Sequence, residues 1–219
     1  MLLRSFIITL TFCLLGGAAT VQHAGKSIDS PIWGPPRVLQ SDTPPNPTVQ
    51  RPMIGGLRIG NFEIVLGNTT MKQAQERLGG EFGGRGDAGD SLEWLCLRGR
   101  DTFGSWVLWL ESGEIDDGDI GSFQLRHVAP EATFDDRCIA LPEAFNVIEL
   151  PIPLHLGMSK AHVLRLMGQP TGREESGLLY IESHEEILQK ESFTEYNAVT
   201  LVIRNGAVWV IEVQKSTTS

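Results

Sequence analysis

The chain has 219 residues, a formal net charge of −9 and an apolar fraction of 41%. This apolar content is too high for a disordered protein, and it is not arranged as repeated spans of about 20 residues, which excludes a multi-span membrane protein. The acidic balance also argues against nucleic acid as a partner, because phosphate recognition requires a basic surface. If the partner is charged, we expect a basic protein.

The first 19 residues have the layout of a secretory signal peptide. Arg4 precedes an apolar run over residues 6–15, and small residues follow at 16–19. The run is short for a membrane span of about 20 residues, so we expect a cleaved signal rather than an uncleaved anchor. Cleavage after Ala19 would remove Arg4 and Cys13, change the net charge to −10 and leave no membrane span. The expected location is periplasmic or secreted.

Residues 20–56 are rich in proline and polar side chains. They hold seven of the 12 prolines, and Trp33 is their only Phe, Tyr or Trp residue. Proline removes backbone donors, and the polar side chains offer little for a core. We therefore predict an extended linker, in which Trp33 is either a docking motif or in local contact with the neighbouring prolines.

Two short helices are predicted from the same start and stop signals. Thr70 precedes a helical run over Met71–Leu78, and Ser159 precedes one over Lys160–Met167, 89 residues later in the chain. Each hydroxyl can cap the first turn, and the glycine nine residues further on can end the helix. Helices of eight residues are too short to be stable alone, so each must pack against a sheet.

Strand-like segments surround each predicted helix. For the first helix they are 62–66, 92–97, 105–110 and 120–128, and for the second they are 147–150, 178–182, 199–204 and 207–214. Asn205-Gly206 joins the last two segments and is a strong hairpin signal. The pattern predicts an α+β fold of two tandem repeats, each a short helix packed on an antiparallel sheet of three to four strands. We place the repeats at residues 57–142 and 143–219.

Cys96 and Cys138 remain after removal of the signal peptide. Two cysteines in an exported chain are expected to form a disulfide. The closed loop of about 43 residues corresponds to a stabilisation of ~4 kcal/mol in the chain-entropy model. The alternative, a reactive thiol, is disfavoured because no histidine lies near either cysteine in the sequence.

Sequence signals for catalysis are missing. The run Gly83-Gly84-Arg85-Gly86 is rich in glycine, but it does not follow a strand in a βαβ unit, and we interpret it as a mobile loop. The sequence contains no P-loop, no nucleophile elbow and no histidine pair at metal-ligand spacing. We therefore predict no catalytic residue, metal ligand or cofactor.

The segment 111–119 concentrates acidic side chains around two glycines. Its five carboxylates belong to Glu111, Glu114, Asp116, Asp117 and Asp119. Three interpretations compete: a calcium-binding loop, a carboxylate pair of a glycosidase, and a solvated turn that contacts a basic partner. The EF-hand spacing is not met and no cleft-forming architecture is indicated, so we favour the solvated turn.

Two tryptophans offer a second candidate surface. Trp106 and Trp109 point to opposite faces of the predicted strand 105–110, and one of these faces must belong to the core. The other tryptophan is either an exposed hot spot for a partner or is covered by the linker or by the opposite repeat. We include both tryptophans, with the five acidic residues, among the candidate partner-binding residues.

The second predicted repeat carries a family motif at Gly157, Ser159, Val163, Gly168 and Pro170. This motif resembles the BamE/SmpA-like outer-membrane assembly lipoproteins. The tandem arrangement with a cysteine pair is similar to the beta-lactamase inhibitor protein (BLIP) family. The resemblance spans about residues 57–214, and it implies a non-enzymatic module that binds another protein.

The sequence thus predicts an exported, non-enzymatic protein-binding module, in its most specific form an inhibitor or immunity-type protein acting on a basic enzyme. One alternative is an envelope-assembly module of the BamE/SmpA type. The other alternative is a calcium-dependent binder or hydrolase that uses residues 111–119.

Overall fold

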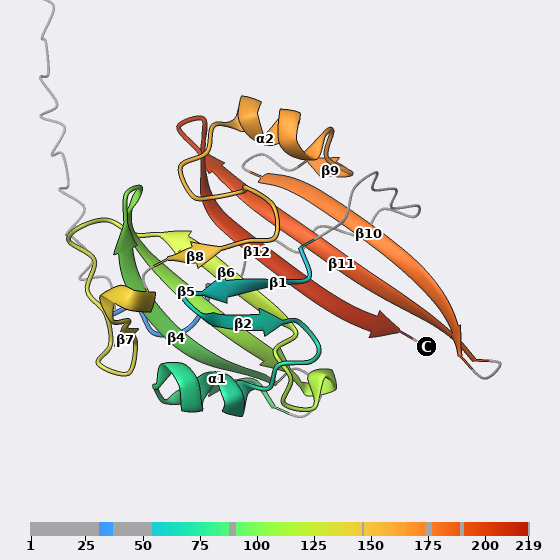
Figure 1. The fold of residues 1–219 in the computed structure, drawn as a ribbon, viewed down its shortest axis with the longest axis horizontal. Coiled ribbons are helices and arrows are strands. Elements are labelled where there is room, and N and C mark those ends of the chain that lie inside the picture. Colours follow the sequence, from blue (N-terminus) through green and yellow to red (C-terminus); the bar gives the residue numbers. More distant parts are fainter. Residues whose placement is uncertain are drawn as a thin grey trace, which may run out of the picture.

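The computed structural model describes residues 31–36, 54–87, 91–145, 147–173, 177–188 and 191–218. These residues form a mixed fold of mostly antiparallel strands in two sheets, with two α-helices (Figure 1). The predicted signal peptide and most of the predicted linker lie outside the described residues.

The larger sheet has nine strands in the order β3-β4-β5-β6-β12-β11-β10-β9, with β7 beside β4. They are β3 (Phe82–Arg85), β4 (Leu92–Asp101), β5 (Gly104–Gly113), β6 (Ser122–His127), β7 (Ile139–Ala140), β9 (Gly172–Arg173), β10 (Gly177–Leu188), β11 (Glu191–Arg204) and β12 (Ala207–Thr218). The β4–β7 pair is parallel, and the other pairs are antiparallel. Because β6 pairs with β12, one continuous sheet runs through both halves of the chain.

A smaller sheet and both helices cover one face of the large sheet, here called the inner face (Figure 1). The covering elements are β1 (Gly56–Ile59), β2 (Phe62–Val65), β8 (Ile148–Glu149), α1 (Met71–Leu78) and α2 (Lys160–Met167), with short 3-10 turns η1 (Glu114–Asp116) and η2 (Glu143–Phe145). Arg58 of β1 forms an ion pair with Glu149 of β8. One cluster of buried apolar side chains joins both helices to both sheets, so the two halves of the chain share a core.

The predicted bounds of both helices are confirmed, and the two helices are capped alike. The side chains of Thr70 and Ser159 accept hydrogen bonds from the backbone N–H three residues later, at 3.1 and 3.3 Å. Gly79 and Gly168 follow the last turns with φ of 84° and 80°, a conformation that favours glycine. The capping chemistry read from the sequence therefore operates at both helices.

Each helix start is also bonded to a turn that precedes a distant strand. Met71 N donates to Gly118 O, and Lys160 N donates to Gly206 O, both at 2.9 Å. The two glycines have φ of 84° and 78°, and the residue before each has φ of 49° or 50°. Two successive residues with positive φ are typical of a tight hairpin turn, which confirms the turn predicted at Asn205-Gly206.

Strands β10, β11 and β12 are longer than predicted and extend past the end of β6 (Figure 1). The sequence indicated a strand only over residues 178–182, whereas β10 continues to Leu188 and is paired with β11 along its whole length. Apolar alternation ends at Ile181, so the pattern carried no signal for the extension. In the described part of the chain, no helix is long and apolar enough to cross a membrane.

The prediction of a mobile loop over residues 83–86 is wrong, because residues 83–85 lie in strand β3. The Trp94 ring lies directly over Gly83, and a Cβ at position 83 would overlap the indole. The neighbouring Gly84 has no such contact. The packing of Trp94 therefore explains why position 83 is a glycine.

Candidate functional site

The face of the large sheet opposite the helices, here called the outer face, is covered over β3–β6. The cover consists of residues 31–36, here called the N-terminal strap, and of the loop 128–138. Beneath them lies a second apolar cluster, formed by Trp94, Cys96, Val107, Trp109, Val128 and Cys138. The strap belongs to the segment for which the sequence predicts an extended linker.

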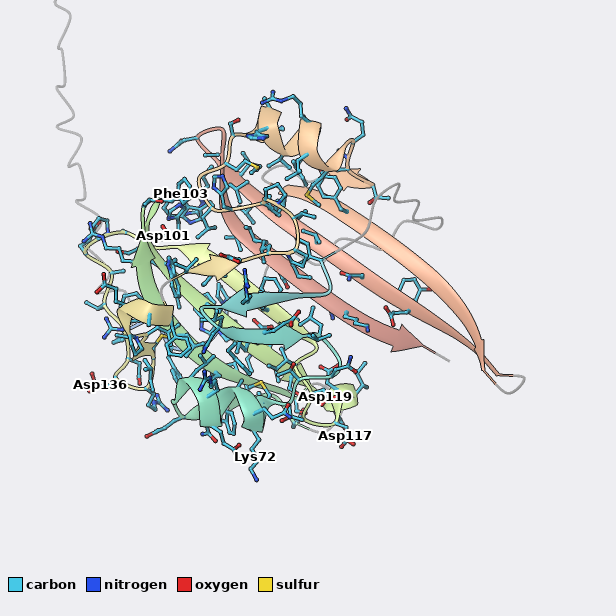
Figure 2. The ribbon with its side chains drawn as sticks, viewed as in Figure 1. Lys72, Asp101, Phe103, Asp117, Asp119 and Asp136 are labelled. Atoms are coloured by element: carbon cyan, nitrogen blue, oxygen red, sulfur yellow. A yellow bond between two sulfur atoms is a disulfide. The ribbon has the colours of Figure 1, made fainter. Side chains whose placement is uncertain are left out.

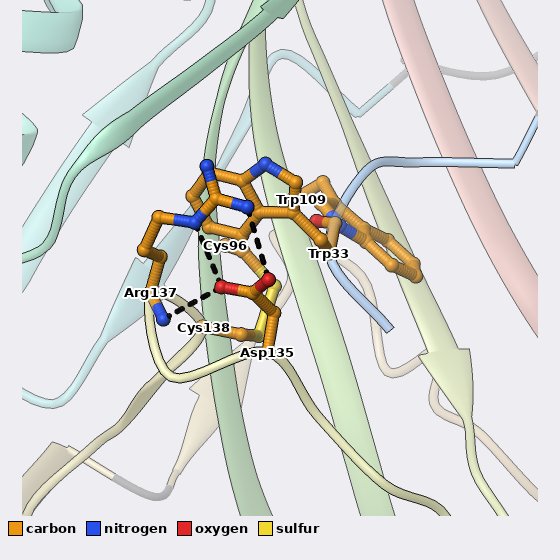
Figure 3. Close-up of polar contacts among 6 residues, drawn as sticks. All are labelled: Trp33, Cys96, Trp109, Asp135, Arg137 and Cys138. Atoms are coloured by element: carbon orange, nitrogen blue, oxygen red, sulfur yellow. Dashed lines mark hydrogen bonds and ion pairs between the residues drawn. A yellow bond between two sulfur atoms is a disulfide. The ribbon is translucent and has the colours of Figure 1, made fainter. Parts of the chain in front are cut away.

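The predicted disulfide between Cys96 and Cys138 is confirmed (Figure 3). Cys96 lies on β4, and Cys138 lies at the end of the loop 128–138. The guanidinium of Arg98 donates a further hydrogen bond to Cys138 O at 3.1 Å. The disulfide therefore fixes one end of the covering loop to the outer face.

The first residues of the strap dock on this covering loop. Ile32 N donates to Thr133 O at 2.9 Å, and Asp135 N donates to Ile32 O at 3.0 Å. Trp33 meets the Trp94 ring edge to face, with the ring centroids 5.9 Å apart. The strap is thus paired with a loop about 100 residues away in the sequence.

An ion pair closes the exposed side of Trp33 (Figure 3). The Arg137 guanidinium lies 4.3 Å from the centre of the Trp33 ring and pairs with Asp135, with Nε 2.7 Å from Oδ1. Hydrogen bonds from the Arg137 side chain and backbone lower the pKa of Asp135 to about 2. This geometry combines a cation–π contact with an ion pair above the indole.

Three side chains of the outer face hold the carbonyl groups of the strap. Trp109 Nε1 donates to Trp33 O at 2.8 Å. Arg85 Nη1 donates to Pro35 O at 2.7 Å, and Gln124 Nε2 donates to Pro36 O at 3.1 Å. Strands β3, β5 and β6 each contribute one donor, so the strap is bonded across the sheet.

The two candidate tryptophans are both buried, each with 1% of its surface exposed. Trp106 belongs to the core of the inner face, and Trp109 lies under the strap on the outer face. Of the two alternatives for the second tryptophan, the structure shows cover by the linker segment. Neither indole is therefore available to a partner in this conformation, which corrects their inclusion among the partner-binding residues.

The five candidate carboxylates divide into one buried group and an exposed loop. Glu111 is only 7% exposed at the end of β5. The other four belong to residues 114–119, here called the acidic loop, which lies beside α1 (Figure 2). Ile115, at the centre of η1, is 79% exposed, and the sequence analysis did not single it out. An exposed isoleucine therefore lies among four carboxylates.

Backbone hydrogen bonds fix the acidic loop. Asp116 Oδ2 accepts from Gly113 N at 2.6 Å, and Asp119 N donates to Asp116 O at 2.9 Å. Ile120 N donates to Thr69 O at 2.8 Å, so the end of the loop is bonded to the residue before the α1 cap. Partial burial raises the pKa of Asp116 above its usual value. The exposed side chains of the loop are thus held on a defined backbone.

A hollow of about 520 Å³ adjoins the acidic loop. Its wall includes Gly113 and Gly118 of the loop region, together with Arg85 and Glu93 from β3 and β4. The hollow and the exposed Ile115 therefore lie at the same end of the sheet, opposite the hairpin tip that carries Asp101 and Phe103 (Figure 2).

Glu111 shares the outer face with a second carboxyl group, that of the half-buried Glu212 on β12. Burial raises the pKa of Glu111 to about 8, the nearby Glu212 raises it further, and the hydrogen bond from Ser122 opposes the shift. Burial also raises the pKa of Glu212 to about 7. Two buried oxygens, Oε1 of Glu111 and Oε1 of Gln124, accept no hydrogen bond from the described residues.

Sequence reasoning missed Glu212, because a polar residue in an alternating strand normally faces solvent. The available signal was Val210, an apolar residue two positions before it on the same face, which suggests a face that is partly covered. As for metal ligands, within the described ranges no three His, Cys, Asp or Glu side chains are placed to hold an ion.

Comparison of the chain with protein-family models, with curated proteins and with solved structures finds no match.

Proposed function

We propose that this protein is an exported, non-enzymatic module that binds a basic protein through the acidic loop. The observation that carries the proposal is Ile115, a 79% exposed apolar side chain among the carboxylates of a fixed loop. A central apolar residue with a polar rim is typical of a binding hot spot. The hydrogen bonds of the loop reduce the entropy that binding would cost, and its charges would attract a basic partner.

Export is supported by two features. Residues 1–19 have the composition of a signal peptide, and the Cys96–Cys138 disulfide requires an oxidising compartment to persist. Together they favour a periplasmic or secreted location.

We also infer that the chain consists of two tandem repeats. Four antiparallel strands of the large sheet follow each helix, in an order that is mirrored about the β6–β12 pair. Equivalent hydrogen bonds connect Met71 with Gly118 and Lys160 with Gly206. By this correspondence the acidic loop occupies the place of a two-residue turn and is an insertion in the first repeat. The inferred arrangement agrees with the resemblance to the BLIP family, which favours an inhibitor-type role.

Capture of the partner from envelope extract tests the proposal. The chain from residue 20 onwards is immobilised, and bound proteins are identified by mass spectrometry at low and high salt. We expect a basic protein that is retained at low salt and depleted at high salt, because exposed charges are screened. Retention of no specific protein would contradict the proposal.

A pair of variants ties the capture to the loop. Ile115→Ser should reduce recovery of the partner at least tenfold, as expected for a hot-spot residue. Val147→Ser is the matched control, because Val147 is also an exposed β-branched residue, 56% accessible, on a different loop. Equal recovery by both variants would exclude the acidic loop as the binding surface.

A further inference from the structure

We propose that the protonation of Glu111 and Glu212 controls whether the C-terminal end of the N-terminal strap, at Pro35 and Pro36, stays hydrogen-bonded to the sheet. With both carboxyl groups neutral, the strap is bonded at Pro35 and Pro36; with both ionised, these two bonds are lost. The outer face would then carry a pH-sensitive latch.

Gln124 connects the acid pair to the strap. It lies directly opposite Glu212 in the β6–β12 register and two residues from Ser122, which lies opposite Glu111 in the β5–β6 register. All four side chains therefore share the outer face. The Gln124 amide donates to Pro36 O through Nε2, while its Oε1 is buried and accepts no hydrogen bond from the described residues.

Arg85 provides the second connection. Its guanidinium donates to Pro35 O at 2.7 Å, and its charge favours the ionised form of Glu111. The same side chain therefore serves a strap carbonyl and is attracted to the carboxylate. The donors to residues 35 and 36 are thus each related to one acid: Gln124 lies opposite Glu212, and the Arg85 charge acts on Glu111.

Ionisation of Glu111 and Glu212 creates new acceptors that compete for the Gln124 and Arg85 donors. Two neutral carboxyl groups can stay buried at small cost, but a buried carboxylate needs hydrogen bonds or a counter-charge. The available donors are the Ser122 hydroxyl, the Gln124 amide and the Arg85 guanidinium. Bonds to a charged acceptor are stronger than bonds to a carbonyl, so Gln124 and Arg85 are expected to turn from the strap to the carboxylates.

The surrounding charges leave the acid pair as the group that titrates near neutral pH. Arg85 faces it from β3, and Arg126 lies on the same face of β6, two residues beyond Gln124. The neighbours on β4 and β11, Trp94 and Thr200, are uncharged. The strap itself contains only Pro, Ile, Trp and Gly.

The first half of the strap provides an internal reference. Ile32 is bonded to the loop 128–138, and Trp33 O accepts from Trp109, with no carboxyl of the acid pair involved. These contacts should persist when Pro35 and Pro36 are released. The latch therefore opens at one end while the other end stays anchored.

NMR spectroscopy of the full chain labelled with ¹³C-proline and ¹⁵N tests the latch. Between pH 5.5 and 9 the carbonyl signals of Pro35 and Pro36 and the side-chain amide signals of Gln124 should shift with a midpoint between about 7 and 8. The Trp109 indole signal should stay unchanged. Constant Pro35 and Pro36 signals would overturn the proposal, and so would a parallel shift of the Trp109 indole.

Variants separate the acid pair from other titrating groups. Glu111→Gln with Glu212→Gln should abolish the transition, because an amide mimics the neutral carboxyl group. Glu212→Gln alone keeps Glu111 titratable and should move the midpoint to lower pH, since Glu212 raises the pKa of Glu111. Glu114→Gln, in the acidic loop, is the control and should titrate like the wild type. A transition that survives in the double variant, or an unmoved midpoint in Glu212→Gln, would contradict the latch.

Discussion

The two halves of the large sheet begin alike and are covered differently. In the first half, α1 precedes β3–β6, and in the second half α2 precedes β9–β12. Each helix is capped by a hydroxyl and bonded to a tight turn before the last strand of its half. Only the first half carries the disulfide, the strap and the acidic loop.

The features that both halves share stabilise the fold, whereas those found in one half are candidates for function. The caps and turns satisfy backbone groups that every short helix leaves unpaired, so both halves need them. The strap and residues 114–116 of the acidic loop lie outside these caps and turns. In the described residues they belong to one half, where we expect the activity of the protein to reside.

The largest expected effect is on the pH dependence of stability, and it compares Glu111, the buried acid of the first half, with Glu212, the half-buried acid of the second. Their pKa values are raised from 4.5 to about 8 and about 7, so the folded state binds these protons more tightly than the unfolded state. The contribution of these two groups to the free energy of unfolding is therefore fully present below pH 4.5 and is lost as the pH rises toward 8, for Glu111 by about 5 kcal/mol.

Glu111→Gln should remove more of this decline than Glu212→Gln, because its pKa shift is larger. Urea unfolding at several pH values between 4.5 and 8.5 measures the difference. A decline that is the same in wild type and both variants would show that other groups control it.

The second effect concerns the disulfide, which is found in the first half. Replacing Cys96 and Cys138 together by alanine should lower the free energy of unfolding by about 4 kcal/mol, from the entropy of the opened loop. Denaturant unfolding of the variant, and of the wild type with and without reductant, measures it. A loss under about 1 kcal/mol would mean that the strap and the loop 128–138 stay docked without the bond.

The third effect tests how tightly the outer face is packed. Gly83→Ala should cost about 2 kcal/mol, because the added methyl overlaps the Trp94 ring and the indole must move. Gly84→Ala is the control in the same strand, where the methyl meets only an ordinary contact with Leu92 O at 3.7 Å. Thermal unfolding compares the two, and equal costs would show that the Trp94 site adapts freely.

The smallest effect tests the equivalence of the two halves. Thr70→Ala and Ser159→Ala should each lower the free energy of unfolding by about 1 kcal/mol, because each removes one cap. Thr70 also takes part in a capping box, so its loss should be slightly larger. Chemical denaturation measures both variants. If removing either cap leaves the free energy of unfolding unchanged, the two helix starts are alike in geometry but not in energy.

Features with a local chemical cause were predictable. The helix bounds follow from a hydroxyl cap and a terminal glycine, and the Asn205-Gly206 turn follows from two residues that accept positive φ. The disulfide was expected from two cysteines in a chain with a predicted export signal.

Features that depend on distant partners were not predictable. Nothing around Trp33 signals that it docks on Trp94, because the proline-rich segment has no periodic pattern. The strand role of Gly83 depends on the same indole. The exposure of Ile115 was not predicted, because the path of the loop backbone decides whether a single apolar residue in a polar run is exposed.

The large sheet is continuous because β6 of one half pairs with β12, the last strand of the other. Either half expressed alone would present that strand as a bare edge, with backbone N–H and C=O groups ready to pair. Such an edge templates self-association, so an isolated half is expected to pair with a copy of itself or to aggregate. Because the two halves are parts of one chain, each covers the strand edge of the other, which protects the protein from self-association.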